Sequence, residues 1–524
     1  MKKTNEKIYN LLEIILKALV FLPLAYLFIA VLFCHNTISF DILELSTIVK
    51  NGPIFFVGLL VGILLLYGLY KILKCVPETL LFVILAGVYI LAGSFLFLNM
   101  ETMLRYDSGI CYWNAANYIE NNYVNMQPGE YFYMWPHQLG LVSYNCILTW
   151  ISNDLNLVYF LNLFWVILTN LFVWMSARLV YKENVVLRKM IIVFCFAFLP
   201  QFFYSFYAYG QVPGLCFLMG ALWSVIYYIK EERKWMLIPT IIFMSAACVI
   251  APNFAVGGIA IIIILLFHIL KDKKWYGLFI IIGIIVSMIV PSRLVIAHYE
   301  RVADADLSQG MPAMLYVAMG LQENEDGVWR ANGWYNGYSE EIYRASNCDV
   351  KQSNELAKAS IRDSINAFAS EPLYAWEFFE EKIVTTWCEP TYQSVWSGPM
   401  IVMGSTTDVA IIEDLYSGGI TFERLIVVMN ILVAFVFGFS LVHIVAQTIT
   451  KQDKMTMLEL FGLLFFYGGF IFHLFWETKS RYVYFYVFML MPIACRGVVD
   501  TFAYMEQKMT RLNNSKNEEG MNKK

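Results

Sequence analysis

Residues 101–140 read ETMLRYDSGICYWNAANYIENNYVNMQPGEYFYMWPHQLG and follow directly on a long apolar run. Among many aromatic residues this stretch carries Glu101, Arg105, Asp107, Glu130 and His137. Ionisable side chains are costly inside a bilayer, so a segment this polar lies outside the hydrocarbon. We expect it to form the mouth of a site on the outer face of a membrane.

The composition is that of a membrane protein. Of the 524 residues, 59% are hydrophobic and 15% are charged, whereas soluble domains are about half apolar and a quarter charged. The apolar residues come in runs of about 20, long enough to cross a hydrocarbon core about 30 Å thick. With a formal net charge of −4, no basic field indicates nucleic acid as a partner. The predicted fold is an all-α polytopic membrane protein.

We expect about twelve transmembrane helices, within a range of about eleven to thirteen, from the apolar runs. The first run is too long for the core of a signal peptide and is interpreted as a retained span. The short apolar piece 138–152 is too short to cross. The expected spans are residues 11–33, 53–74, 79–99, 157–178, 189–208, 212–229, 235–251, 254–270, 276–297, 423–447, 457–475 and 482–503.

Lysines and arginines in the short loops predict the orientation, because such residues favour the cytoplasmic side. With twelve spans, the basic clusters all fall on the side of the N-terminus. Both termini are then cytoplasmic, and two large loops, 100–156 and 299–421, are extracytoplasmic. The clusters include Lys2, Lys3, Lys7, Lys71, Lys74, Arg178, Lys182, Arg188, Lys189, Lys230, Arg233, Lys234, Lys271, Lys273, Lys274, Lys451 and Lys454.

The second large loop has its own helical pattern. Apolar residues near helical spacing predict a helix from about Asn354 to Ala369, and Pro372 favours the start of another. We therefore expect a helical cap over the outer face. The resulting division is 1–298 as an N-terminal transmembrane module with loop 100–156, 299–421 as the cap, 422–504 as C-terminal transmembrane helices, and 505–524 as a cytoplasmic tail. The last residues of this tail, RLNNSKNEEGMNKK, are predicted to lack structure.

Most of the ten cysteines lie in apolar runs, where a thiol behaves as a small hydrophobic group. Cys348 and Cys388 share one outer loop, and either a disulfide or two free thiols fits the sequence. No CxxC pair, HExxH, GxxxxGK[ST] or GxGxxG after a strand is present. An ATP-driven pump and a zinc protease are thus disfavoured.

Asp107 is the leading candidate for chemistry. A carboxylate at the outer boundary can act as a general base toward an acceptor hydroxyl, and Glu101 or Asp154 can supply a second acidic group. The structural alternative is that Asp107 is the N-cap of a helix over SGICYWNAANYIENNY, since Asp is a good N-cap.

A second group of candidates lies around the turn HLFWETKSRYVY. Lys479 and Arg481 are basic on the outer side, against the general trend. They suit the phosphate of a lipid carrier, which arginine grips through two bonds and lysine attracts as a point charge. The alternative is an ion pair of either residue with Glu477, with the long stems reaching toward the head groups. His473 and Tyr482 lie beside them.

Two aromatic stretches complete the set of candidates. QPGEYFYMWPHQLG contains His137, and KIVTTWCEPTYQSVWSGP contains Trp387, Glu389 and Tyr392. Aromatic faces beside polar groups are typical of sugar-binding sites. They are equally typical of packing at the membrane surface, where Trp and Tyr are common, and His137 also fits an ordinary interfacial histidine.

The order of RYDSGICYWNAANYI, YFYMWPHQLGL, many spans, EKIVTTWCEPTYQS and WETKSRYVY resembles a known family. The chain is similar to the membrane glycosyltransferases of the GT-C fold, in the branch of dolichyl-phosphate-mannose–protein mannosyltransferases and their bacterial relatives. Asp107 stands where that family has its catalytic Asp, and Lys479, Arg481 and Tyr482 resemble its late basic motif. Many relatives have Glu next to this Asp, whereas Ser108 follows here.

The resemblance implies hexosyl or pentosyl transfer from a polyprenyl-phosphate-linked sugar to a glycan, lipid or protein acceptor in the cell envelope. No cofactor is implied with certainty, and the role of a divalent metal stays open. Two alternatives remain: a transporter or flippase for a lipid-linked glycan, and a polymerase or ligase that uses a diphosphate-linked glycan donor. The sugar, the acceptor and the stereochemical outcome are not predicted.

Overall fold

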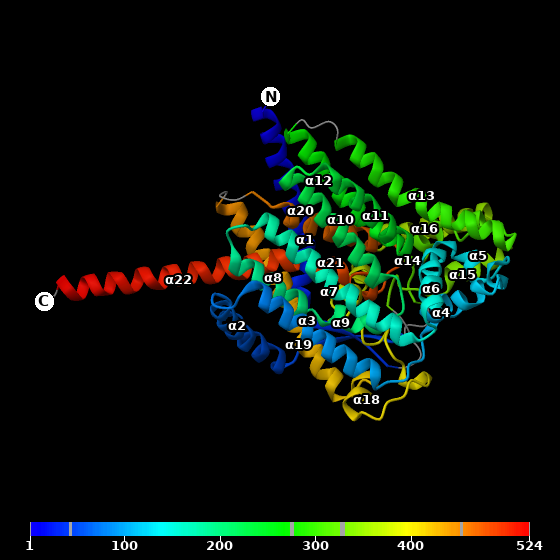
Figure 1. The fold of residues 1–524 in the computed structure, drawn as a ribbon, viewed down its shortest axis with the longest axis horizontal. Helices are drawn as coiled ribbons and strands as arrows, with labels where there is room; N and C mark the ends of the chain where they lie inside the picture. Colours follow the sequence, from blue (N-terminus) through cyan, green and yellow to red (C-terminus); the bar gives the residue numbers. More distant parts are fainter. Residues whose placement is uncertain (1, 41–43, 273–276, 325–330, 451–453, 523–524) are drawn as a thin grey trace.

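The computed structural model describes residues 2–40, 44–272, 277–324, 331–450 and 454–522. Helices dominate this part of the chain (Figure 1), and its only sheet is a two-stranded antiparallel one. The high helical content follows from the apolar composition, because a helix satisfies its own backbone polar groups within one segment. The all-α expectation is therefore confirmed in its main part.

Ten helices in the described residues are long and apolar enough to cross a membrane, which supports a multi-pass membrane protein. They contain α1 (Lys2–Phe33), α2 (Pro53–Leu73), α3 (Glu78–Leu98), α7 (Leu155–Val180), α10 (Gln211–Glu231), α12 (Ala255–Asp272), α13 (Gly277–Ala303), α19 (Ile420–Thr450), α20 (Met457–Phe475) and α22 (Met491–Asn522).

Two of the twelve expected spans take another form. The run 189–208 contains a 50° bend between α8 (Val185–Ala197) and the segment Leu199–Phe206, and counts as an eleventh span if the pair is taken together. Pro200 follows the break, where a proline interrupts helical hydrogen bonding. The run 235–251 forms a shorter apolar helix, Lys234–Ile250.

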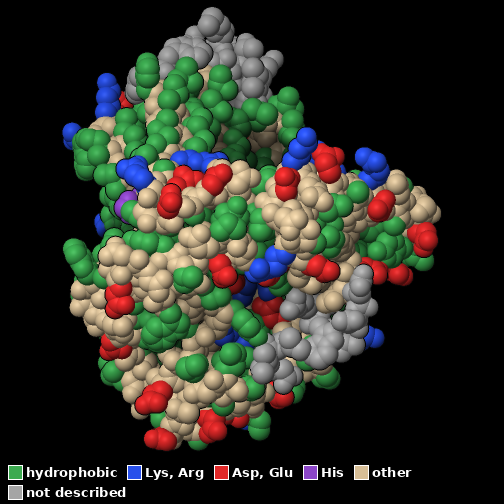
Figure 2. All heavy atoms as spheres, turned by 90° about the vertical axis from the view of Figure 1, so that its right-hand side faces the viewer, with side chains coloured by type: hydrophobic (Ala, Val, Ile, Leu, Met, Phe, Trp, Pro, Cys, Tyr) green, Lys and Arg blue, Asp and Glu red, His purple; other side chains and the backbone are tan. Residues whose placement is uncertain are grey.

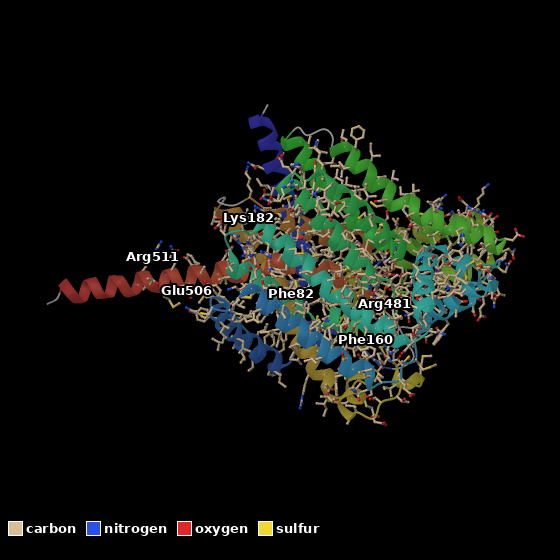
Figure 3. The ribbon with its side chains drawn as sticks, viewed as in Figure 1. Phe82, Phe160, Lys182, Arg481, Glu506 and Arg511 are labelled. Carbon is tan, nitrogen blue, oxygen red and sulfur yellow. The ribbon has the colours of Figure 1, made fainter. Side chains whose placement is uncertain are left out.

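The elements of the two large loops gather at one end of the molecule. In Figure 1, α4 (Tyr106–Ile119), α5 (Tyr131–Met134), α6 (Leu139–Ile151) and α15 (Tyr338–Ala345) lie at the right, far from the C-terminus. Figure 3 places Arg481 toward this end and Lys182 and Glu506 toward the opposite one.

Both helices predicted in the second large loop are present. They are α16 (Val350–Ser370) and α17 (Pro372–Trp387), with the side chain of Asp349 capping the first and Pro372 opening the second. A further short helix, α14 (Ala313–Gly320), packs against α16. These helices form the body of the cap.

A hairpin between α1 and α2, which the sequence does not predict, connects α1 to the cap. Strands β1 (Cys34–Ile38) and β2 (Ser46–Lys50) pair in an antiparallel register. The Asn36 backbone N–H donates to the Cys388 carbonyl at 2.9 Å, and its side chain donates to the Thr385 carbonyl at 3.0 Å. Strand β1, which precedes Glu44 in the chain, is thereby held against the end of α17.

One further expectation differs from the structure, and the structure decides between the two alternatives for Cys348 and Cys388. Helix α22 continues to Asn522, although the composition predicts an unstructured tail. All ten cysteines are free thiols, and Cys388 is buried while Cys348 is partly exposed, so the disulfide between them is not formed.

Helix α6 approaches α11 (Leu237–Ile250) very closely at Gly140. A Cβ atom added at Gly140 would lie 1.8 Å from the Val249 carbonyl oxygen, which is far inside van der Waals contact. The close approach fixes the start of α6, and therefore the turn of residues 136–138 that precedes it.

Replacing Gly140 by Ala is therefore expected to lower the thermal unfolding midpoint, Tm, of the purified protein in detergent. Forcing the helices apart costs about 1–3 kcal/mol, as for other overpacked sites. Gly68→Ala is the matched control, because its added Cβ meets no atom within 4 Å and alanine is the better helix former by about 0.5–1 kcal/mol. Equal Tm changes in the two variants would contradict the close contact.

Candidate functional site

A cavity of about 510 Å³ opens among the outer-loop elements and is the site for which the structure makes the best case. Its walls come from the hairpin connection, the start of α4, the α5–α6 region, residues 207–209, the cap, and the turn after α20. Figure 2 views this end of the molecule and shows acidic and basic side chains inside a central recess. Segments almost the whole length of the chain apart thus meet in one place.

Two cations lie in the cavity wall and share one carboxylate. Lys479 and Arg481 belong to the turn after α20, and Lys479 forms a buried ion pair with Glu44. The other Glu44 oxygen, Oε1, lies 3.6 Å from Nη1 of Arg481. Burial lowers the pKa of Lys479, while the charge of Glu44 opposes that shift. The alternative that these cations pair with Glu477 is not what the described residues show, since Glu44 is their ion-pair partner.

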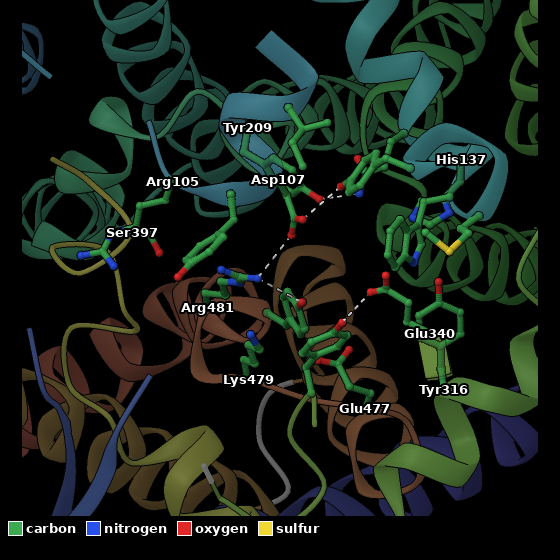
Figure 4. A pocket seen from close by; sticks show the side chains of 18 of the residues that line it. Arg105, Asp107, His137, Tyr209, Tyr316, Glu340, Ser397, Glu477, Lys479 and Arg481 are labelled. Atoms are coloured by element: carbon green, nitrogen blue, oxygen red, sulfur yellow. Dashed lines mark hydrogen bonds and ion pairs between the residues drawn. The ribbon is translucent and has the colours of Figure 1, made fainter. Parts of the chain in front are cut away.

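Asp107 faces this cationic pair. Its Oδ2 lies 3.8 Å from Nη2 of Arg481, and its Oδ1 accepts a hydrogen bond from the Tyr131 hydroxyl at 3.1 Å (Figure 4). The side chain is 38% exposed, so an incoming hydroxyl has access to it. A carboxylate with one oxygen oriented by a phenol and the other beside a cation is suited to holding a proton during catalysis.

Asp107 is not the N-cap of its helix. Helix α4 begins at Tyr106 with Arg105 at the N-cap, and no side chain caps it. Tyr106 itself has a φ of 28°, a region that residues other than glycine rarely occupy. Such strain is often found beside functional groups, and here it lies between two side chains that line the cavity.

The predicted residues His137 and Tyr482 also line the cavity. His137 is exposed and lies in the short turn before α6. Its neighbour Gln138 donates to the Tyr209 hydroxyl, which joins this wall to residues 207–209. Tyr482 lies next to Arg481, whose guanidinium carbon is 5.3 Å from the centre of the tyrosine ring.

The two other predicted carboxylates lie outside the cavity. Glu101 forms an isolated bridge with Thr406 through backbone hydrogen bonds of 2.9 Å. Asp154 is exposed and is the N-cap of α7, where it accepts from the Asn156 backbone N–H at 2.9 Å. Neither is placed to assist Asp107, so their predicted catalytic role is not supported by the geometry.

Glu389 belongs to the framework behind the cavity. It is 1% exposed and accepts from the backbone and hydroxyl of Thr391, at 3.0 and 2.6 Å, and from the Gln393 backbone. The Ser480 hydroxyl donates to it at 3.3 Å. Burial raises the pKa of Glu389 to about 7. Ser480 stands between the two cavity cations, so Glu389 orients their turn and does not line the cavity.

The remaining aromatic candidates are also buried in the core. Trp387 packs against Phe466 with ring centres 5.4 Å apart, and Tyr392 is fully buried. His473 is buried in α20 with its ring 6.2 Å from that of Tyr482. Trp387 and Tyr392, the candidates for sugar binding, pack in the core, and His473, a candidate for binding the lipid phosphate, does not line the cavity.

Lys382 attaches the cap to the same turn. Its buried ammonium donates to the carbonyls of Leu474 and Trp476, both at 3.0 Å, and to that of Gly320. Burial lowers its pKa to about 7. The three carbonyls compensate for burying the ammonium, and they fix the end of α20 just before the residues that enter the cavity.

Residues that the sequence did not single out complete the walls. One feature of the sequence could have pointed to Glu44. Lys479 and Arg481 needed an acidic counter-ion, and Glu44 is an acidic residue in a predicted loop. Tyr207 and Tyr209 follow the bent span and gave no signal. The described residues contain no group of three or more His, Cys, Asp or Glu placed to hold a metal ion.

Glu44 is expected to be essential for stability. Glu44→Gln leaves Lys479 and Arg481 without their shared carboxylate, and removing one partner from a buried ion pair costs about 3–5 kcal/mol. We expect a large fall in Tm in detergent. Glu355→Gln, which breaks an exposed pair with Lys358 on α16, should leave Tm unchanged. Similar Tm values for both variants would contradict a buried role for Glu44.

Glu477 is expected to make stability depend on pH. Burial raises its pKa to about 7 from 4.5, against the attraction of Lys479 and Arg481. The folded chain then binds more protons than the unfolded chain between these values, so this contribution to stability decreases as pH rises from about 4.5 to 7, by up to about 3 kcal/mol. Glu477→Gln should flatten the Tm–pH curve over this range, whereas the exposed Glu130→Gln should not.

The chain matches no protein-family model and no curated protein. Its function therefore rests on the arrangement of the cavity, in which the partly exposed Asp107, the cations Lys479 and Arg481 and several tyrosines converge at the end of a bundle of apolar helices, together with further charged residues of the wall.

Proposed function

We propose that this chain is an integral-membrane glycosyltransferase that moves a sugar from a polyprenyl-phosphate donor to an acceptor at the outer face of the membrane. The observation that carries the proposal is the meeting of Asp107 with Arg481 at 3.8 Å, in one cavity with Lys479. A base and a phosphate-binding pair are the two parts that such a transfer needs.

The cations are suited to the lipid phosphate. Arg481 presents a planar guanidinium that can bind two phosphate oxygens at once, and Lys479 adds a point charge. Both are largely buried, with side chains 12% and 7% exposed. In such surroundings their attraction for the charge that develops on the leaving phosphate is stronger than in water.

Asp107 then acts on the acceptor. The acceptor hydroxyl oxygen forms a bond to the anomeric carbon of the sugar as its proton passes to the Asp107 carboxylate. The bond between that carbon and the phosphate oxygen breaks, and its electron pair stays on the phosphate, which Arg481 and Lys479 hold. No nucleotide takes part. Tyr131 keeps the carboxylate oriented through its hydrogen bond to Oδ1.

Two of the motifs that carry the resemblance to GT-C enzymes, RYDSGICY and WETKSRYVY, contribute to the same cavity, which supports the proposal. In this proposal the cavity lies on the extracytoplasmic side, both termini are cytoplasmic, and the acceptor is a glycan, lipid or protein that approaches over α5 and α6. The cap formed by α14, α16 and α17 limits access of water from above.

The test is sugar transfer by the purified chain in nanodiscs, offered polyprenyl-phosphate sugars and nucleotide sugars side by side. Transfer from the lipid donor alone is expected. Asp107→Asn should lower kcat by about 10²–10⁴-fold, the usual contribution of a general base, with Tm retained. Asp154→Asn is the matched control, because Asn also caps helices well and the site lies outside the cavity; it should keep full activity.

Two results would overturn the proposal. Activity retained in Asp107→Asn would remove this carboxylate from the mechanism. Failure of transfer from every donor, together with movement of labelled glycolipid between the leaflets of liposomes, would favour a transporter.

A further inference from the structure

Arg105 is a buried cation that forms no ion pair with any residue in the described part of the chain. It is 3% exposed, lines the cavity, and none of its three guanidinium nitrogens has a hydrogen-bond partner among the described residues. Its guanidinium carbon lies 3.8 Å from the centre of the Trp396 ring, so the cation packs over the face of this ring. A buried charge that lacks hydrogen bonds is strongly unfavourable. A site that is kept in this state suits a ligand that supplies the missing acceptors.

A second unused donor accompanies Arg105. The Ser397 hydroxyl also lines the cavity, is buried, and has no partner in the described part of the chain. Figure 4 shows Arg105 and Ser397 on the same side of the cavity, away from the centre where Asp107 and Arg481 meet. The stretch CEPTYQSVWSGP thus contributes to the cavity through Ser397, while Trp396 supports Arg105, and not through the residues singled out from the sequence.

The positive charges in the two parts of the cavity are neutralised to different extents by nearby carboxylates. Lys479 and Arg481 share Glu44, and Arg481 also lies near Asp107. Arg105 forms no ion pair among the described residues, although Glu44 attracts it and Arg481 repels it. One anion placed between Lys479 and Arg481 leaves the charge of Arg105 uncompensated.

We propose that Arg105 and Ser397 form a second oxyanion subsite, which binds phosphate or carboxylate oxygens of a substrate that carries two acidic groups. The inference rests on the proposed function, in which the first acidic group is the phosphate held by Lys479 and Arg481. The second is either a further phosphate of the donor or an acidic group on the acceptor. The guanidinium presents its donors in one plane, which is the geometry that two-pronged recognition of phosphate and carboxylate requires.

The first test is binding of inorganic phosphate to the full chain in nanodiscs, followed through the rise in Tm. In an Arg481→Gln background, phosphate should still stabilise the protein. Adding Arg105→Gln to that background should weaken the apparent affinity by about 10-fold or more, as expected for loss of charged hydrogen bonds. Arg362→Gln, which removes an exposed arginine of α16, is the matched control and should have no effect.

Ser397→Ala provides a second variant if Arg105→Gln does not fold. It removes one hydroxyl, should keep the elution profile of the wild type, and should weaken phosphate binding a few-fold, about the worth of one hydrogen bond. Arg105→Lys, which keeps the charge and loses the planar donors, should fall between wild type and Arg105→Gln. The subsite is refuted if Arg481→Gln alone abolishes the phosphate response, or if Arg105→Gln leaves it unchanged.

Transfer assays identify the source of the second acidic group. Donors with one or two phosphates are compared, each with neutral and carboxylate-bearing acceptors. Arg105→Gln should raise KM by about 10-fold or more for the substrate that carries the group, and by less than about 2-fold for its partner. An unchanged KM for every substrate would also overturn the inference. Failure of all transfer would count against the proposed function alone, because phosphate binding is measured without turnover.

Discussion

The ion pair between Glu44 and Lys479 is the interaction on which the cavity depends. Two cations as close as Lys479 and Arg481 repel each other, and each loses hydration when the surrounding helices bury it. Glu44 offsets both costs, with one carboxylate oxygen toward each cation. Both oxygens of the Glu44 carboxylate face a cation. Asp107 is not needed as the main counter-ion, and its side chain is partly exposed at 3.8 Å from Arg481. Glu44 thus neutralises the two cations, and Asp107 remains accessible for catalysis.

The framework that holds this arrangement consists of buried polar groups with specific partners. The Glu389 carboxylate accepts hydrogen bonds from residues 391–393 and from Ser480. The Lys382 ammonium donates hydrogen bonds to carbonyls at the end of α20 and to that of Gly320. The backbone N–H of Glu477 donates to the Tyr316 carbonyl at 3.0 Å, and that of Thr478 donates to Gly333. The turn that carries the cations is therefore fastened to the cap on several sides, as a preorganised site requires.

Properties that depend on local sequence could be predicted for this chain. Apolar length identified the membrane helices, and the Pro372 signal located the start of α17. Asp107, Lys479 and Arg481 were each recognisable, because a charge beside an apolar run on the outer side is unusual. Glu101 and Asp154 were predicted to lie near Asp107 but lie outside the cavity. Nearness along the chain says little about which way a side chain points. Glu44 was missed because its partners are more than 400 residues away, and sequence alone does not reveal such pairings.

The hairpin that holds Glu44 has a consequence for biogenesis. Glu44 leaves the ribosome 435 residues before Lys479, which at about 5–20 residues per second is roughly 20–90 s. Throughout that interval the hairpin, α4 and most of the cap are made, yet the basic turn that completes the cavity is missing. A chain that stops before the turn after α20 leaves Glu44 without its two cations, whereas a chain that includes this turn pairs and buries it. The ion pair that prepares the site for a substrate therefore forms late in synthesis.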